Sequence, residues 1–526
     1  MFRFVVGRIL VLSSLILPSL AFAQTASPPQ EQPARNARFS TFLNGSAVSV
    51  SCPDSNGNDV AGQPFTEPVI IPARLRSDIP LDVRSFTRNI PIYTFLPPAS
   101  VDCKVLPFTV RNYGWQQTPG AGFTYGFPGP TIVLQKPTAA APGDRLIIPL
   151  TNNLSLSNED CVQTGNPLCP SSLCSGSAPP QCCSAQKVAP PNCFHGDNTT
   201  NLHFHGTHVS PQSPQDYVLL ELQPYGTPTH GHAPHSALGT VAIGSFTYNV
   251  NPIGPDQPDG TQWYHPHKHG STALQVGNGM AGTLIVKGEF DEFLKLFYAE
   301  QGGLVEHVMV MQQVHDLNFT KDFDVTVGVK NIAFAPLPLI NGLMQPVVTM
   351  KPNEVQRWRF VSATMEASAQ ILIDFNSPAN LGLQAKQIAM DGVRFSDTNY
   401  QKQPLLSDPS DLQFAISPGN RADFLVKAPA TPGLYALTYD VFGRVEQQGE
   451  EQRQRSRLGR GKRQPTNEDV KDILEAIAPG TSTQPVLLTI KVEECSTCPD
   501  MSFPPKLPGM PPYLQPIPPS DNVQNV

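Results

Sequence analysis

Short apolar and β-branched runs, separated by turns rich in Pro, Gly and Asn, repeat along most of the chain. Runs this short, bounded by turn residues, are typical of strands in a β-sandwich. In the first half the pattern predicts strands at 131–134, 146–150, 218–220 and 283–286. A second set is predicted at 308–311, 347–350, 355–361, 371–373, 424–426, 434–439 and 486–490. Between the two sets, residues 291–299 have the pattern of a short connecting helix.

The composition supports the same fold class. The 526 residues include 56 Pro and 39 Gly, and only 15% are charged, whereas soluble domains have roughly 25%. Proline breaks helices and is confined to turns and strand edges within sheets. We therefore expect an all-β protein, long enough for more than one domain.

The N-terminus has the pattern of a secretory signal. Two arginines precede the apolar run Ile9–Leu20, and Ala21-Phe22-Ala23 supplies a small-x-small cleavage site. A membrane anchor is the alternative, which the short run and Pro18 disfavour. We expect export to the periplasm or the extracellular space, with no integral membrane segment after cleavage. The net charge of −7 gives no support for nucleic-acid binding.

Ten cysteines fit an oxidising compartment, where disulfides persist. Six of them crowd into a Ser-, Pro- and Gly-rich insert at about 155–196: Cys161, Cys169, Cys174, Cys182, Cys183 and Cys193. This insert has little apolar surface to bury, so we expect disulfides to hold it together. Zinc binding is the alternative, because Cys495 and Cys498 also form a CxxC pair.

These patterns divide the chain into six segments. They are a signal peptide (1–23), a linker (24–38), a first β domain (39–290), a connector (291–300), a second β domain (301–492) and a Pro-rich tail (493–526). The basic run 444–463 in the second domain favours a solvated loop over a binding patch.

The histidines are the residues most indicative of chemistry, because ten of the 12 lie between His195 and His269 and none follows His315. The run Asn201–His208 contains His203 and His205, and the run Trp263–Gly270 contains His265 and His267. Alternate side chains of a strand point to one face, so two such strands would bring four imidazoles together. Neutral imidazole suits copper, iron, nickel and zinc, and copper binds most tightly of the divalent ions.

The other histidines in this window are weaker candidates. His208 and His269 are candidates for the site or for hydrogen bonding around it, and a purely structural role is the alternative. A flexible loop is favoured over loose metal capture for the group His230, His232 and His235. His195 is interpreted as part of the cysteine-rich insert.

The run HFHG, followed some 60 residues later by WYHPHKHG, resembles the first two copper motifs of the multicopper oxidases, the family of laccase-like and ascorbate-oxidase-like enzymes. Further first-domain segments also resemble this family: Gly129-Pro130-Thr131-Ile132, Pro142-Gly143-Asp144, Thr151-Asn152-Asn153-Leu154 and Gly279-Met280-Ala281-Gly282. Second-domain segments do so too: Leu339-Ile340-Asn341-Gly342, Gln356-Arg357-Trp358-Arg359, Met390-Asp391-Gly392 and Ser417-Pro418-Gly419-Asn420-Arg421-Ala422-Asp423. The resemblance covers roughly residues 90–490, outside the cysteine-rich insert.

The resemblance implies two tandem cupredoxin-like Greek-key β-sandwich domains, the first carrying the disulfide-rich insert and the second holding no copper. It makes His203 a ligand of a type 2 copper, and His205, His265 and His267 ligands of a type 3 pair. The implied chemistry is oxidation of a substrate at a type 1 copper, coupled to reduction of dioxygen to water at the trinuclear site.

The sequence departs from this family in one respect. It contains neither HxxHxH nor HCHxxxH, the motifs that supply the other trinuclear ligands and the type 1 copper from a third domain. The expectation is therefore a half-site, with the third domain on a separate chain or lost.

Three functions stay open from the sequence. The chain is a multicopper-oxidase polypeptide incomplete by itself, a non-enzymatic periplasmic copper-binding protein, or a copper-independent structural or interaction module. The reductant, a small molecule or a metal ion, cannot be read from the sequence.

Overall fold

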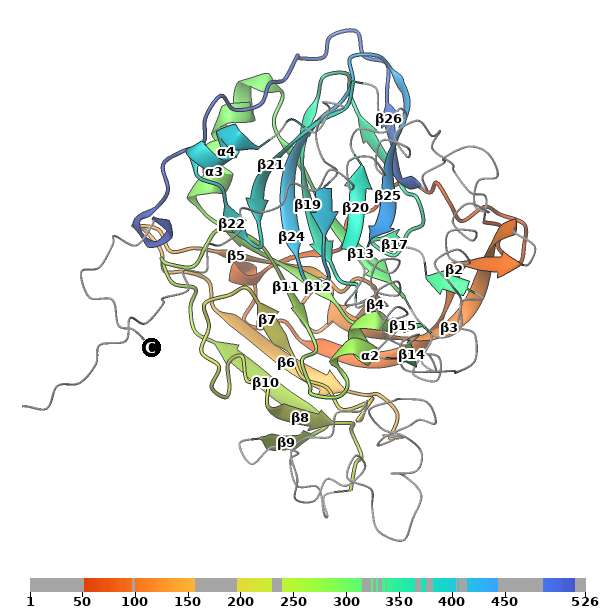
Figure 1. Ribbon diagram of the computed structural model, residues 1–526. Helices are drawn as coiled ribbons and strands as arrows, with labels where there is room; N and C mark the ends of the chain where they lie inside the picture. Colours follow the sequence, from red (N-terminus) through yellow and green to blue (C-terminus); the bar gives the residue numbers. More distant parts are fainter. Residues whose placement is uncertain are drawn as a thin grey trace, which may run out of the picture. The chain divides into compact units, whose positions relative to one another are not determined.

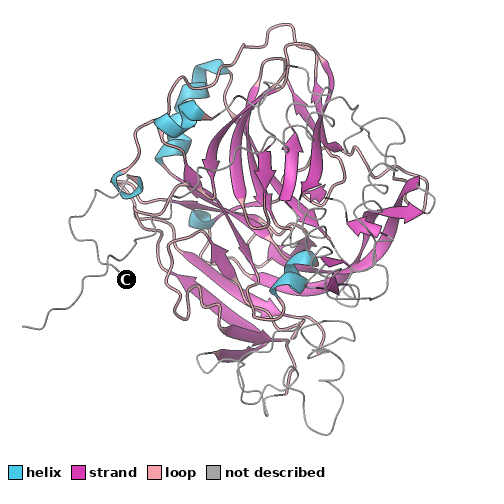
Figure 2. Cartoon of the chain, viewed as in Figure 1, coloured by secondary structure: helices cyan, strands magenta, loops and turns pink. Residues whose placement is uncertain are grey.

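Two pairs of β-sheets make up most of the computed structural model, with few helices (Figures 1 and 2). The structure describes residues 52–96, 100–156, 196–228, 239–314, 323–324, 328–329, 334–336, 338–364, 370–374, 382–403, 405, 414–442 and 486–515. All of them belong to one compact unit, Phe42–Val526.

The first pair of sheets is built from the N-terminal half. One sheet has the order β1 (Ile70–Pro72), β5 (Thr131–Gln135), β12 (Gly282–Lys287), β11 (Gly260–His265), β7 (His203–His205). The other has the order β10 (Ser245–Val250), β6 (Leu146–Asn152), β2 (Leu81–Leu96), β3 (Ser100–Gln116), β4 (Phe123–Gly126), and β16 (Phe334–Pro336) also pairs with β2. A separate two-stranded sheet joins β8 (Leu220–Gln223) and β9 (Thr240–Ile243).

The core of this half lies between its two sheets. Burial alternates along β6, where Leu146, Ile148 and Leu150 are buried, because successive side chains of a strand point to opposite faces. These leucines and isoleucines share one apolar cluster with Phe204 of β7 and Tyr264 of β11. The two sheets therefore form a sandwich.

The second pair of sheets follows the same plan. One has the order β17 (Pro338–Ile340), β13 (Val305–Gln313), β19 (Val355–Ser362), β24 (Arg421–Lys427), β21 (Gln384–Met390), β22 (Val393–Arg394). The other has the order β18 (Val347–Met350), β26 (Val486–Val492), β25 (Gly433–Phe442), β20 (Gln370–Asp374), β23 (Phe414–Ile416). A short pair joins β14 (Phe323–Asp324) and β15 (Gly328–Val329). A second apolar cluster, containing Trp358, Phe360 and Phe424, fills this sandwich.

The few helices are short and lie between strands. They are α2 (Thr272–Gly277), α3 (Glu289–Tyr298) and α4 (Asp397–Lys402), with 3-10 turns at Ala73–Leu75, Ala299–Gln301 and Pro512–Leu514. None of the helices in the described ranges is long and apolar enough to cross a membrane.

The two sandwiches meet through strand β11, which is buried along its whole length. While Tyr264 enters the first core, Trp263 belongs to a separate apolar cluster with Val308 and Val310 of β13 and Val361 of β19. Because β11 is covered on both faces, its histidine, His265, is buried.

The all-β expectation is confirmed, and most predicted strands are found close to their expected limits. The connecting helix begins at Glu289, two residues early, and continues to Tyr298. The predicted strand 218–220 was wrong in position, since β8 begins at Leu220, where Asn201 Nδ2 binds the carbonyls of Val218 and Leu220.

Two disulfides are found among the described residues, Cys52–Cys103 and Cys495–Cys498. The second contradicts zinc binding by the Cys495/Cys498 pair, because both sulfurs are oxidised. Several sequence predictions lie outside the described residues: the signal peptide, the six cysteines of the insert, His195, the group His230, His232 and His235, and the basic run 444–463.

Candidate metal centre

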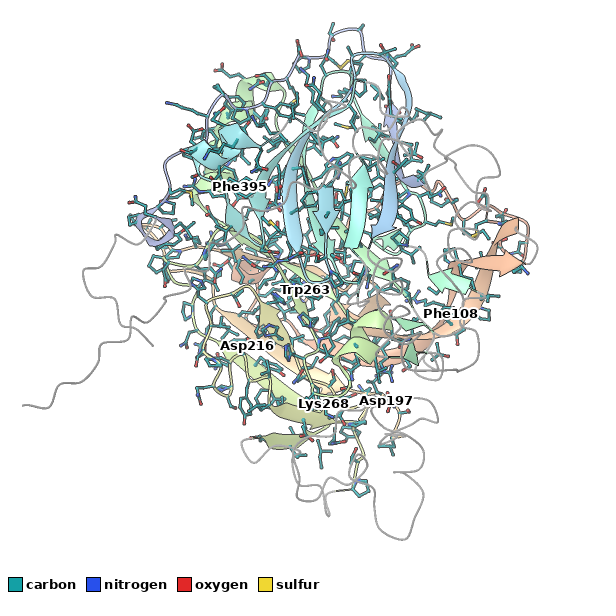
Figure 3. All side chains as sticks on the ribbon, viewed as in Figure 1. Phe108, Asp197, Asp216, Trp263, Lys268 and Phe395 are labelled. Atoms are coloured by element: carbon teal, nitrogen blue, oxygen red, sulfur yellow. A yellow bond between two sulfur atoms is a disulfide. The ribbon has the colours of Figure 1, made fainter. Side chains whose placement is uncertain are left out.

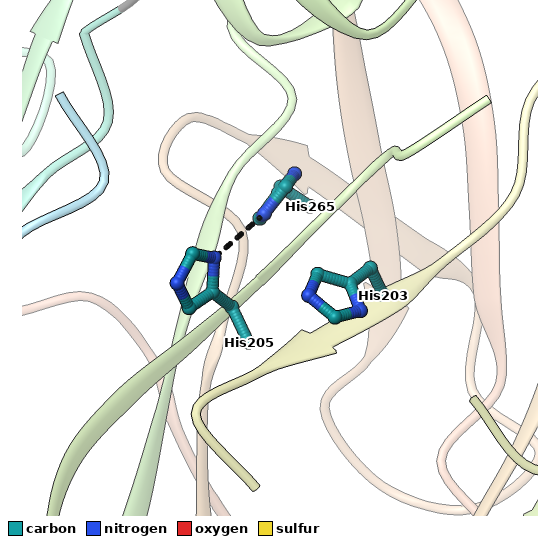
Figure 4. Close-up of side chains that lie close together, drawn as sticks. All are labelled: His203, His205 and His265. Carbon is teal, nitrogen blue, oxygen red and sulfur yellow. Dashed lines mark hydrogen bonds between the residues drawn. The ribbon is translucent and has the colours of Figure 1, made fainter. Parts of the chain in front are cut away.

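Three of the predicted histidines meet where β7 pairs with β11. His203 lies opposite His265, and His205 lies opposite Trp263, in the antiparallel register of these strands. Ring nitrogens of His203, His205 and His265, one from each, all lie within 4.8 Å of one another (Figure 4). The neighbours Phe204 and Tyr264 point into the first core, which is why the histidines alternate onto the other face.

Hydrogen bonds fix which nitrogens of these rings are free of protons. Nδ1 of His265 lies 2.8 Å from the carbonyl of Pro266, which can only accept, so Nδ1 carries the proton. Nε2 of His265 therefore has a lone pair, and it lies 3.2 Å from Nδ1 of His205. In the metal-free protein His205 donates from Nδ1 to His265, and a shift of that proton to Nε2 of the same neutral ring leaves two nitrogen lone pairs aimed at a common point.

Burial favours the neutral form of three of the predicted ligands, His205, His265 and His267. It lowers the pKa of His205 to about 4, with the positive charge of Arg421 as the second cause. Burial also lowers the pKa of His265 well below its ordinary value and lowers that of His267. Because a metal binds the neutral ring, His205 and His265 are ready for a metal at neutral pH, and three imidazoles fit a copper ion.

Asp216 is a residue of the site that the sequence did not point to. It is labelled in Figure 3. Its carboxylate lies 2.8 Å and 3.0 Å from Nδ1 of His203 and accepts the backbone N–H of Phe204 at 3.0 Å. The carboxylate thus holds the proton of His203 on Nδ1 and presents Nε2 to the other two rings. Such partners orient metal-binding histidines.

The remaining predicted site residues lie around this group or apart from it. The ring of His267 lies 4.9 Å from that of His203, centroid to centroid, and its backbone N–H donates to Asn201 Oδ1 at 2.6 Å. His208 is exposed, and its Nδ1 lies 3.9 Å from the carboxylate of Asp256. His269 is exposed as well. The metal-binding roles of all six histidines stay predictions.

Sequence comparison finds a limited similarity to known proteins. No protein-family model matches the chain. A stretch of 154 residues, 28% of the chain, is 27% identical to proteins named multicopper oxidase mco from Staphylococcus haemolyticus and from Staphylococcus epidermidis. This stretch of the chain is similar in sequence to multicopper oxidases. The match spans about 30% of the length of these curated relatives.

Solved multicopper oxidases are also similar to the chain in structure. The 2F4 variant of McoA from Aquifex aeolicus has a TM-score of 0.48 and 14% identity, over 86% of this chain and 69% of that one. The multicopper oxidase from Campylobacter jejuni, described as a metallo-oxidase, has a TM-score of 0.42 and 16% identity, over 92% of this chain and 70% of that one.

Replacing Asp216 by Ala should weaken copper binding by about tenfold, because partners that orient a metal-bound histidine typically contribute 10- to 100-fold in affinity. Asp216→Asn keeps an acceptor oxygen and should lose less. The measurement is competition with a chelator of known affinity, and Gln212→Ala, at an exposed position before Asp216, is the control. Equal affinities for Asp216→Ala and Gln212→Ala would show that the carboxylate does not orient the ring.

Proposed function

We propose that the chain is a copper-binding protein of the multicopper oxidase type, in which His203, His205, His265 and His267 hold copper. The observation that carries this proposal is the convergence of three histidine ring nitrogens within 4.8 Å. Bound copper would supply one-electron redox chemistry and the reduction of dioxygen. The protein's own part is to keep His205 and His265 uncharged by burial and to select the ring nitrogens of His203 and His265 through Asp216 and the Pro266 carbonyl.

We propose further that the other ligands of a trinuclear site come from a further cupredoxin domain, because residues 1–526 contain neither HxxHxH nor HCHxxxH. The substrate oxidation implied by the relatives would then require that domain as well. Binding of copper without oxidation is the second candidate function, and it is favoured by the fact that three described histidines already converge within this chain.

Export is proposed as well. The disulfides Cys52–Cys103 and Cys495–Cys498 support it, because disulfides persist in oxidising compartments and are rare in the cytosol. The apolar segment before Gln24 has the pattern of the required signal.

Copper titration tests the proposed function. We expect the purified chain to bind one or two copper ions, and the variant with all four histidines changed to Ala to bind copper at least about 100-fold more weakly, because imidazole nitrogens are the proposed ligands. The matched control changes His208 and His269 to Ala and should bind like the wild type. Unchanged affinity in the four-histidine variant would refute a copper site here.

Oxygen consumption separates the two candidate functions. With a phenol as reductant, the copper-loaded chain alone should consume little dioxygen if the oxidase needs a further domain. Rapid consumption by the lone chain would contradict the incomplete-oxidase proposal and leave the copper site in place.

A further inference from the structure

A turn of the second sandwich lies against the candidate metal centre of the first. Residues 417–420 form this turn, in which Asn420 N–H donates to the Ser417 carbonyl at 3.0 Å and Asn420 Oδ1 accepts from Ser417 N–H at 3.1 Å. Asn420 Nδ2 also contacts both carboxylate oxygens of Asp391 at 3.2 Å. The turn is thus stabilised by its own hydrogen bonds and by Asp391, which lies between β21 and β22.

Arg421, directly after the turn, fastens it to strand β11. The buried guanidinium donates to the carbonyls of Gly419 and Asp391, each at 2.9 Å, on its own side of the junction. On the other side it donates to Gln262 Oε1 at 2.9 Å and to the Thr261 carbonyl at 3.3 Å. A planar guanidinium with four fixed acceptors has little freedom to rotate.

The clamped turn reaches the His205 ring itself. A Cβ atom added to Gly419, whose φ is +82°, would lie 3.8 Å from Cε1 of His205 and 3.8 Å from Cζ2 of Trp263. A Cβ added to Gly206, the next residue after His205, would lie 1.9 Å from Gln262 Oε1 and 2.6 Å from Nη2 of Arg421. Only glycine fits at position 206, so the Arg421–Gln262 pair packs directly against the backbone that follows His205.

The same side of the second sandwich also supports His265, through Trp263. The indole ring of Trp263 stacks on the His265 ring with 4.0 Å between centroids and 26° between planes. Trp263 is buried among apolar side chains that include Val308 and Val361 of the second sandwich. The second sandwich therefore contacts the His205 ring through the turn, and it supports His265 indirectly, by packing against the indole ring on which His265 stacks.

We propose that Arg421 is a positioning residue of the metal centre, and that the turn 417–421 fixes the orientation in which His205 meets the metal. This inference rests on the proposed copper site for its functional meaning, and it goes beyond that proposal by assigning the second sandwich a part in the site. If the only need at this point were to bury the contact between the two sandwiches, an uncharged side chain would serve in place of the Arg421 guanidinium.

The test compares Arg421→Gln with Arg421→Lys and with Thr261→Val. Thr261→Val is the matched control, because it removes the hydrogen bond from Thr261 Oγ1 to Asp423 at 2.7 Å while leaving the Thr261 carbonyl that Arg421 uses. Both Arg421→Gln and Thr261→Val weaken the contact between the two sandwiches. Only Arg421→Gln removes the guanidinium that packs against the backbone next to His205. Arg421→Lys keeps the charge and one donor, so it should recover part of the wild-type behaviour.

Two readouts are measured. In the copper-loaded chains we expect Arg421→Gln to bind copper about tenfold more weakly and to change the copper hyperfine splitting in the electron paramagnetic resonance spectrum, with Thr261→Val unchanged in both. In the metal-free chains labelled with ¹⁵N-histidine, the ring signals of His205, assigned with His205→Asn, should shift in Arg421→Gln and stay in place in Thr261→Val.

Equal effects of Arg421→Gln and Thr261→Val on both readouts would overturn the positioning role and leave only a structural contact. If the wild-type chain binds no copper, the proposed function fails, while the metal-free ring signals still decide whether Arg421 orients His205. If Arg421→Gln does not fold, Arg421→Lys against Thr261→Val decides by the same two readouts.

Discussion

Replacing Asp423 by Asn is expected to lower the free energy of unfolding by about 3–5 kcal/mol, the cost of removing one partner from a buried ion pair. Asp423 is 1% exposed and belongs to β24 of the second sandwich. One oxygen of its carboxylate accepts from Arg357 at 2.7 Å and from Arg359 at 3.1 Å. Asparagine has nearly the same shape, so the change isolates the loss of charge.

The cost is large because the charges around Asp423 balance. Arg357, Arg359 and Lys287 are the cations, and Asp291, Glu306 and Asp423 are the carboxylates of one buried network. Burial alone would raise the pKa of Asp291 and of Glu306, but the two arginines outweigh it and lower the pKa of both acids. Asp291 and Glu306 are therefore charged at neutral pH. Asp423→Asn removes the carboxylate that pairs with Arg357 and Arg359 and leaves an uncompensated positive charge.

This network also joins the two sandwiches. Asp423 accepts from Thr261 of β11 at 2.7 Å, and Asp291 at the start of α3 accepts from Arg357 at 2.9 Å and from Arg359 at 2.7 Å. A charge left without a partner at this place destabilises the contact that keeps the turn 417–421 next to β7. We therefore expect the loss of stability to appear as weaker packing between the halves as well as earlier unfolding.

Denaturant unfolding at neutral pH measures the effect. Asp500→Asn is the control, because Asp500 is exposed and pairs with Lys427 at 2.7 Å, and exposed pairs contribute about 0–1 kcal/mol. A loss for Asp423→Asn as small as that of the control would mean that water enters the network and screens it.

The sequence predicts the parts of the site that depend on local spacing. The strand period of two places His203 and His205 on one face and Phe204 on the other, and the structure has this alternation. The pairing of β7 with β11 brings the second group of histidines opposite the first. This pairing was expected only because both runs place histidines at alternate positions of a strand.

The parts that the sequence did not reveal depend on residues far apart in the chain. Asp216 lies 13 residues after His203 in an irregular segment, with no spacing that marks it as a partner. The contact of Arg421 with Gln262 joins residues 159 positions apart. Such contacts follow from how the two sandwiches pack, and periodicity carries no information about packing between domains.

The strands β2 and β3 were missed for a related reason. Their 16 and 17 residues form a long hairpin that contains Pro91 and several charged residues, a composition that argues against a central strand. Long-range contacts stabilise it. Pairing with β16 covers one edge, and the disulfide to Cys52 attaches it to a segment that precedes both sandwiches.

Replacing Cys52 and Cys103 together by Ala should destabilise the chain by about 4 kcal/mol, from the entropy that a cross-link closing a loop of this size removes from the unfolded state. The two cysteines are 51 positions apart in sequence, and both are buried, at 0% and 4% exposure. The segment after Cys52 bridges to Met344 through Ala61 and to Val347 through Pro64. Loss of the disulfide therefore also frees a segment that contacts the second sandwich.

The disulfide Cys495–Cys498 provides the internal comparison. Its cysteines are three positions apart, and because the entropy term grows with the logarithm of loop length, its removal should cost about 2.5 kcal/mol less than removal of Cys52–Cys103. Denaturant unfolding of the two double variants measures the difference. Similar losses for the two would mean that the unfolded chain stays compact around the hairpin, or that the native contacts of the Cys52 segment hold without the cross-link.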